Sequence, residues 1–209
     1  STEALENEAM AKLQAQWLER VLASNPQRWT VVSYHHPMFS VSQGRDNPLL
    51  RQYWQPLFAK YGVDLALQGH DHVYGRQVAP GLKNTDMKNT DLKSEQAGTV
   101  YLVSVAGPKM YLVADQARRA MQKVAEDTQL FQVLDFGSDE LRYQSFTASG
   151  KLYDSFELKR QPDGSKRLLE TEPAKLLPLR RCGNPNQATA DDNKCWEGDD
   201  FGLAAAANR

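Results

Sequence analysis

The chain has 209 residues, of which 41% are hydrophobic and 24% charged, and its formal net charge is −1 at pH 7. Such a balance is typical of a globular protein and excludes a general nucleic-acid binder or a polybasic membrane protein. No apolar run approaches the roughly 18 residues that a membrane-spanning helix needs. We therefore expect neither nucleic acid nor a membrane as a partner.

The first part of the chain has the pattern of one parallel crossover unit. Residues 2–23 predict a helix, which Asn25-Pro26 ends because a residue before proline is disfavoured in helical geometry. Residues 29–34 predict a buried strand, residues 48–61 a second helix and residues 63–67 a second strand. A strand, helix and strand in this order form a parallel, right-handed unit. The apolar face of the first helix is expected to comprise Leu5, Met10, Leu13, Trp17, Leu18 and Leu22.

The second part predicts mainly antiparallel structure. Residues 99–105 read as a third strand and residues 114–125 as a short helix. Residues 129–136, 141–147 and 152–159 then read as three strands joined by short turns, which is typical of a meander. From residue 161 onward, prolines and glycines are too frequent for long elements. We expect a domain over residues 1–160 and an irregular tail over residues 161–209.

Two cysteines, Cys182 and Cys195, lie close together in this predicted tail. A disulfide between them would contribute roughly 3 kcal/mol and would place the protein outside the cytosol. The alternative is two unrelated free thiols. We favour the disulfide, because nothing else in that segment can build a core, and we expect a periplasmic or extracellular protein.

All four histidines follow predicted strands. His35 and His36 come after the first strand, and His70 and His72 come after the second. The carboxyl ends of parallel strands form the edge at which α/β proteins bind ligands and metals. Neutral imidazole is the commonest protein ligand for zinc and iron. His70 and His72 alternate along an extended segment, and this spacing suits two adjacent ions better than one. The alternative is that these histidines are structural, hydrogen-bonded residues.

The histidine segments resemble a known family. The run Gly69-His70-Asp71-His72-Val73-Tyr74 resembles the Gly-His-x-His motif of the calcineurin-like metallophosphoesterases. With Arg76 it is closer to the purple acid phosphatase branch, although Gly75 stands where plant and animal members commonly have glutamate. The run from Val32 to Pro37 resembles that branch's Val-x-x-His motif. The resemblance covers about residues 8–160.

The resemblance implies roles for these residues. His35 and His70 would bind the second, divalent metal, and His72 would bind the first metal, which is ferric iron in purple members. His36 aligns with no ligand and is a candidate catalytic residue, which would either contact the substrate phosphate or orient the residues around the metals. The cofactors would be two metal ions, such as Fe with Zn, Mn or Fe. Tyr74 and Arg76 match the motif but are expected to be structural.

Motifs that the family places earlier do not occur before His35. They supply the bridging aspartate, an asparagine ligand and a histidine that assists the leaving group. The resemblance therefore implies the C-terminal half of a four-layer α/β/β/α metallophosphoesterase sandwich. The chain begins at Ser1 rather than at methionine, which suggests a processed product or a fragment. We expect the missing N-terminal half to be a partner, supplied as a separate chain after cleavage, unless it has been lost.

The function that this implies is hydrolysis of phosphoric esters by metal-activated water, as in the acid phosphatases. Two alternatives stay open. The chain could be a non-catalytic fragment or interaction module that keeps the scaffold, or the enzyme could act on phosphodiesters or nucleotides.

Overall fold

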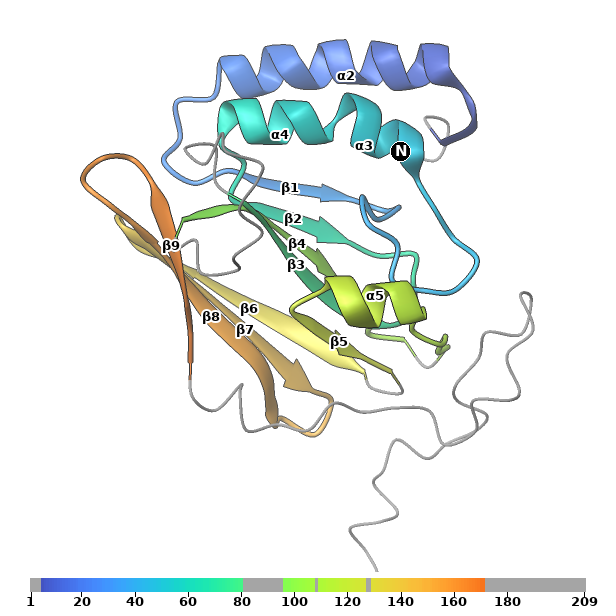
Figure 1. Cartoon of the computed structure of the whole chain (residues 1–209). Helices are drawn as coiled ribbons and strands as arrows, with labels where there is room; N and C mark the ends of the chain where they lie inside the picture. Colours follow the sequence, from blue (N-terminus) through green and yellow to red (C-terminus); the bar gives the residue numbers. More distant parts are fainter. Residues whose placement is uncertain (1–4, 81–95, 108, 127–128, 172–209) are drawn as a thin grey trace, which may run out of the picture.

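A computed structural model describes residues 5–80, 96–107, 109–126 and 129–171, and they form three layers (Figure 1). Helices cover one face of a mixed β-sheet, and a second, antiparallel sheet packs against its other face. The class is therefore mixed α/β, as predicted, and these residues supply three layers of the expected four-layer sandwich.

The helical layer consists of α2 (Glu8–Ala23), α3 (Pro48–Tyr53) and α4 (Gln55–Tyr61). The side chain of Asn7 caps α2 by accepting a hydrogen bond from the backbone N–H of Met10 at 3.2 Å. The sequence predicted one helix over residues 48–61, but the helix is interrupted at Trp54. Pro56 explains the interruption, because proline has no backbone N–H to donate to the carbonyl of Gln52 and its ring crowds the preceding turn.

The predicted apolar face of α2 is only partly correct. Leu18 and Leu22 are buried as expected, together with Ala11 and Ala15. Leu13 and Trp17, which the pattern placed on the same face, are instead 57% and 58% exposed. Two apolar stripes therefore run along this helix, and the described residues bury one of them.

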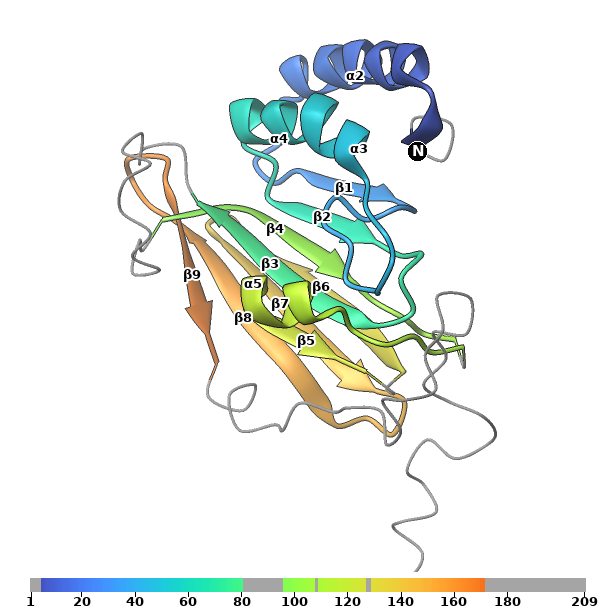
Figure 2. The same ribbon diagram turned by 45° about the vertical axis from the view of Figure 1, so that its right-hand side comes forward.

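The first sheet has the strand order β1-β2-β4-β3-β5. Its parallel part comprises β1 (Val31–Tyr34), β2 (Leu65–Gln68) and β4 (Ala97–Val103), so the predicted parallel crossover is confirmed. Strand β3 (Tyr74–Pro80) is antiparallel to β4 and to β5 (Lys123–Ala125). The short helix α5 (Asp115–Ala120) lies beside this end of the sheet in both views (Figures 1 and 2).

The second sheet is an antiparallel meander of β6 (Leu130–Phe136), β7 (Glu140–Thr147), β8 (Leu152–Arg160) and β9 (Lys166–Glu170). The first three strands match the prediction, whereas β9 falls in the segment that was predicted to be irregular. A tight turn explains the difference. Gly164 has a φ of +82° and donates to the carbonyl of Gln161 at 2.9 Å, so Pro162 and Gly164 turn the chain back into the sheet. The expected boundary at residue 160 therefore cuts through a hairpin, and the rest of the predicted tail, with Cys182 and Cys195, lies outside the described residues.

Two main clusters form the core. One lies between the helices and the first sheet, and includes Leu50, Phe58, Ala66 and Tyr101. The other lies between the two sheets, and includes Leu65, Leu102, Tyr143 and Phe156. Strands β2 and β4 contribute to both, so they are covered on both faces and provide the rigid frame for the loops that follow them. None of the described helices is long and apolar enough to span a membrane.

Candidate metal centre at the carboxyl ends of β1 and β2

The parallel pairing of β1 and β2 brings two histidine segments to the same edge of the sheet. Tyr34 is paired with Gln68 at the last position of the register, so His35 and His36 leave β1 beside the point where His70 leaves β2. The backbone N–H of Gly69 donates to the carbonyl of His35 at 2.9 Å, which continues the pairing into the loops. The prediction that these histidines lie at strand ends is confirmed.

Three imidazoles meet at this edge. His35, His36 and His70 each offer a ring nitrogen, and these nitrogens lie within 4.8 Å of one another. His70 Nδ1 and His35 Nε2 are 3.1 Å apart. Two imidazole nitrogens on one ion are separated by roughly 3 Å, given metal–nitrogen bonds of about 2.0–2.1 Å. The separation found here therefore fits a shared metal ion.

The fourth histidine, His72, is held separately. Its Nδ1–H donates to the carbonyl of Lys109 at 2.8 Å, and its ring packs 4.7 Å from that of Tyr111. Since that hydrogen bond puts the proton on Nδ1, Nε2 keeps its lone pair, which is the usual arrangement for a histidine that binds a metal. The sequence grouped His72 with His35 and His70 as ligands and left His36 apart. The structure instead places His36 in the close group and His72 outside it.

The protonation of the grouped histidines also suits metal binding. Burial lowers the pKa of His70 to about 4, and the nearby positive charge of Arg45 acts in the same direction. Burial likewise lowers the pKa of His36, and the proximity of His35 adds to this effect. Both rings are therefore neutral near pH 7, and a neutral imidazole can donate a lone pair to an ion.

Buried side chains hold the two histidine loops together. The Gln68 side chain accepts from the Tyr34 hydroxyl at 2.9 Å and from the Met38 backbone N–H at 2.5 Å. The Asp71 carboxylate is 1% exposed and accepts from the backbone N–H groups of Val41 at 2.6 Å and Ser42 at 3.0 Å. Asp71 therefore acts as a clamp on the loop after β1, and it is not part of the close histidine group.

His70 has an unusual backbone. Its φ is +64°, and among the described residues no other residue except glycine has a positive φ. A left-handed conformation costs roughly 1–2 kcal/mol for a residue with a Cβ. The residue with this strained backbone is also the one whose Nδ1 lies 3.1 Å from His35 Nε2, and such strain is often found at functional sites.

One further residue of the site was not predicted from the sequence. The Arg45 guanidinium lies 4.8 Å from the centre of the Tyr111 ring, and its Nη1 contacts the His70 carbonyl at 3.2 Å and Asp71 at 3.3 Å. These contacts fix a positive charge beside the histidines. The loop that carries Arg45 is polar and contains Gly44, and nothing in its composition distinguishes this arginine from an ordinary surface charge.

Tyr74 and Arg76, the other motif residues, are almost fully buried between the sheets. Arg76 pairs with Asp154 at 2.9 Å, and the Tyr74 hydroxyl donates to the same carboxylate at 2.6 Å. Their role is therefore structural, as expected.

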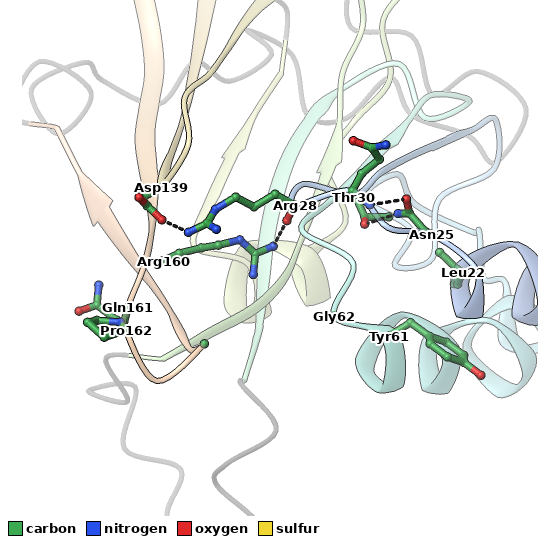
Figure 3. A pocket seen from close by; sticks show the side chains of 12 residues that line it. Leu22, Asn25, Arg28, Thr30, Tyr61, Gly62, Asp139, Arg160, Gln161 and Pro162 are labelled. Carbon is green, nitrogen blue, oxygen red and sulfur yellow. Dashed lines mark hydrogen bonds and ion pairs between the residues drawn. The ribbon is translucent and has the colours of Figure 1, made fainter.

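A cavity of about 770 Å³ lies at the opposite, amino-terminal end of β1 and β2 (Figure 3). Its lining includes Arg28, Thr30, Asp139 and Arg160. Arg28 pairs with Asp139, and Arg160 donates to the Arg28 carbonyl, so these charged groups are engaged with one another. The histidines lie at the other end of the strands, and we interpret this cavity as structural.

Comparison with known proteins supports the expected resemblance. The model of the calcineurin-like phosphoesterases matches residues 2–74, the region that contains all four histidines. This region is therefore similar to the calcineurin-like phosphoesterases, and the expected resemblance is confirmed.

Purple and tartrate-resistant acid phosphatases are among the proteins to which the chain is similar. The rat tartrate-resistant acid phosphatase type 5 is 28% identical over 164 residues, which are 73% of this chain and 44% of the rat protein. Purple acid phosphatase 17 of Arabidopsis thaliana is 40% identical over 55 residues, which are 26% of this chain and 16% of the plant protein. The structure of a purple acid phosphatase from yellow lupin seeds superimposes with a TM-score of 0.56 and 25% identity.

The chain spans less than half the length of the proteins that it matches. The lupin comparison covers 72% of this chain but only 29% of the lupin chain. A large part of the relatives' structure thus has no counterpart among these 209 residues.

Proposed function

We propose that the chain is part of a phosphoric ester hydrolase of the acid phosphatase type, which uses a dinuclear metal centre. The observation that carries this proposal is the convergence of His35, His36 and His70 from two neighbouring strand ends to within 4.8 Å. The family match and the acid phosphatase relatives support it. Bound metal ions would polarise the phosphoryl group and lower the pKa of the attacking water.

The geometry suggests a division of roles among the histidines. His35 and His70 face each other at 3.1 Å and would hold one ion. His72 would bind a second ion through Nε2, because Nδ1 is engaged with Lys109. His36 packs against His70 with 4.1 Å between ring centres, and we assign it to the substrate phosphate. Arg45 would provide a fixed positive charge for the same phosphate.

Completion of the site requires more than these residues. Among the described residues no carboxylate joins the close histidine group. Two adjacent dications need negative ligands, so we propose that a segment beyond this chain supplies them. This segment would be the N-terminal half of the catalytic domain, either covalently continuous or as a separate chain. Its absence would leave the alternative function, a non-catalytic fragment that keeps the scaffold.

Intact mass and metal content, measured on one purified sample of the native protein, test the proposal. We expect a longer polypeptide, or two polypeptides in a complex, with close to two metal ions. His35→Asn and His70→Asn should each remove about one ion, and His72→Asn should remove the other. His36→Asn should keep both ions and lose phosphatase activity. A native protein without bound metal would contradict the proposal.

The substrate class needs a separate assay, because the alternatives include phosphodiesters and nucleotides. The purified protein should hydrolyse p-nitrophenyl phosphate faster than bis-p-nitrophenyl phosphate. The opposite ranking would favour a phosphodiesterase.

We also propose a periplasmic or extracellular location with a Cys182–Cys195 disulfide. Intact mass before and after reduction should differ by about two hydrogens, and identical masses would favour free thiols.

A further inference from the structure

Two cations lie over the ring of Tyr111, beside the candidate metal centre. The Arg45 guanidinium is 4.8 Å from the centre of this ring, and the Lys109 ammonium is 5.2 Å from it. A cation at such a distance is attracted by the face of an aromatic ring. The same ring packs against His72, with 4.7 Å between the ring centres. Tyr111 therefore holds two positive charges next to a histidine of the site, and we call Arg45 and Lys109 the Tyr111 cation pair.

The backbone fixes the segment that carries Lys109 and Tyr111. The carbonyl of Lys109 accepts from His72 Nδ1 at 2.8 Å, and the backbone N–H of Tyr111 donates to the carbonyl of His72 at 3.1 Å. The same segment is joined to the loop that carries Arg45, because the backbone N–H of Ala114 donates to the carbonyl of Val41 at 2.8 Å. The two cations therefore extend from loops that are hydrogen-bonded to each other.

The charge of the Tyr111 cation pair is only partly neutralised. Arg45 lies 3.3 Å from the Asp71 carboxylate, which also accepts two backbone N–H groups. Lys109 is exposed, and no carboxylate of the described residues forms an ion pair with it. Like charges that lie close together repel each other, and an anion between them offsets this repulsion. The pair is therefore suited to a ligand that places a negative charge next to Lys109.

We propose that Lys109 is a specificity-determining residue, which recognises a second anionic group on the substrate. The inference rests on the proposed function, in which Arg45 faces the phosphate that is hydrolysed. Since Lys109 shares the Tyr111 ring with Arg45, its ammonium would meet the part of the substrate next to that phosphate, which is the leaving group. The preferred substrates would be phosphate monoesters whose leaving group carries a negative charge.

Two substrates that differ in one charge test the proposal on the native, metal-loaded protein. The leaving group of meta-carboxyphenyl phosphate is an anion, whereas that of meta-carbamoylphenyl phosphate carries a neutral amide of nearly the same shape. We call the ratio of their kcat/KM values, carboxylate over amide, the charge preference. Lys109→Met should lower the charge preference by about three- to fivefold, the range expected for an ion pair in contact with water.

Further variants assign the effect to the charge at this position. Lys109→Arg should keep the charge preference, and Lys109→Glu should lower it below the value for Lys109→Met. Lys60→Met, which removes a lysine shortly before the amino-terminal end of β2, is the matched control and should leave it unchanged. The same charge preference in the wild type and in Lys109→Met would show that Lys109 only packs on Tyr111, and would overturn the proposal.

Binding without turnover separates this inference from the proposed function. The meta-carboxybenzyl and meta-carbamoylbenzyl phosphonates carry the same groups but no ester bond, so calorimetry measures their affinities directly. Lys109→Met should weaken binding of the carboxylate relative to the amide by the same factor. Hydrolysis of both esters with a charge preference that does not depend on Lys109 refutes only this inference. Lys109-dependent binding of the phosphonates without hydrolysis of either ester refutes only the proposed function, and neither binding nor hydrolysis refutes both.

Discussion

Arg45 is a residue of the candidate site that the sequence did not indicate. Three contacts, to the His70 carbonyl, Asp71 and the Tyr111 ring, hold its guanidinium beside the histidines. A charge that is already fixed in place loses little entropy when a phosphate binds. Arg45 is therefore expected to contribute directly to substrate affinity.

We predict that Arg45→Met lowers kcat/KM for a phosphate monoester by about 10- to 100-fold, since a charge-assisted hydrogen bond contributes roughly 1.5–3 kcal/mol. The change should appear mainly in KM, and metal content should stay the same. Arg119→Met, which removes an exposed arginine from α5, is the matched control. Unchanged kinetics, or loss of metal, would show that Arg45 does not act on the substrate.

Gly75 illustrates a constraint from close packing. A Cβ at this position would lie 2.6 Å from Val41 Cγ2 and 3.0 Å from the sulfur of Met121. A side chain as large as glutamate has no room at this position in this structure. The missing side chain at Gly75 therefore leaves the space that the Val41 side chain fills. Val41 belongs to the loop whose backbone N–H groups donate to Asp71.

We predict that Gly75→Ala lowers the free energy of unfolding by about 1–3 kcal/mol, because overpacking forces neighbouring groups to move. Adding Val41→Ala should restore part of the loss, since it removes the atom in conflict. Urea denaturation of the two single variants and the double variant measures this coupling. Strict additivity of the two effects would contradict the packing explanation.

At the scale of elements, the ion network between β3 and β8 connects the two sheets. Arg76 and Asp154 are 1% and 0% exposed, and Glu170 on β9 also contacts the Arg76 guanidinium at 2.9 Å. Lys123 on β5 lies 3.6 Å from Asp154. Strand β3 directly follows the loop of His70 and His72, so this network anchors the histidine loop to the second sheet.

We predict that Asp154→Ala destabilises the fold by about 3–5 kcal/mol, because it leaves the buried Arg76 short of negative charge. Replacing both partners, with Arg76→Met and Asp154→Leu, should recover most of this loss. Asp135→Ala, on the exposed side of β6, should change stability by no more than about 0.5 kcal/mol. If the double variant is as unstable as Asp154→Ala, the buried charge is not the cause.

Elements with a regular pattern of apolar residues were predictable from the sequence. Elements that depend on pairing with strands far away in the sequence were not. The meander of β6, β7 and β8 and the parallel β1 and β2 follow from apolar runs and turn residues. Strand β3 was missed because its first residues, Tyr74 to Arg76, were interpreted only as part of a loop motif. Strand β5 has three residues and ended a predicted helix, and β9 follows a proline and a glycine that form a turn rather than a break.

The candidate site was predictable to a similar degree. Strand ends and residue types led to the four histidines, and the spacing of the motifs led to the family. Which imidazoles meet could not be predicted, because it depends on the turn at His70 and on the hydrogen bond of His72 to Lys109. Arg45 could not be found either, because it reaches the site through a loop without any regular pattern.

At the scale of the whole molecule, the described layers are unevenly covered. Both faces of the first sheet are packed, but apolar side chains on the second sheet stay open, with Phe131, Phe136 and Leu169 between 39% and 53% exposed. On α2, Leu13 and Trp17 are 57% and 58% exposed as well, so apolar side chains stay open on both outer layers of the described residues.

We predict a gradient of hydrogen exchange that follows this coverage. Amides of β2 and β4, in the interior of the first sheet, should exchange most slowly, and those of β1, at its edge, should exchange faster. Mass-spectrometric hydrogen exchange measures the difference. Equal exchange of β1 and β2 would mean that the edge of β1 is covered.

The left-handed turn at His70 has an evolutionary consequence. Glycine adopts this conformation without steric cost, so a copy of the protein that no longer needed the imidazole would gain stability by replacing it. Genetic drift after loss of function should therefore leave glycine or asparagine here before it alters the exposed His35. His70 therefore occupies a position at which glycine would cost less strain, so the imidazole, rather than the backbone, is the feature of this residue that a test of function should address.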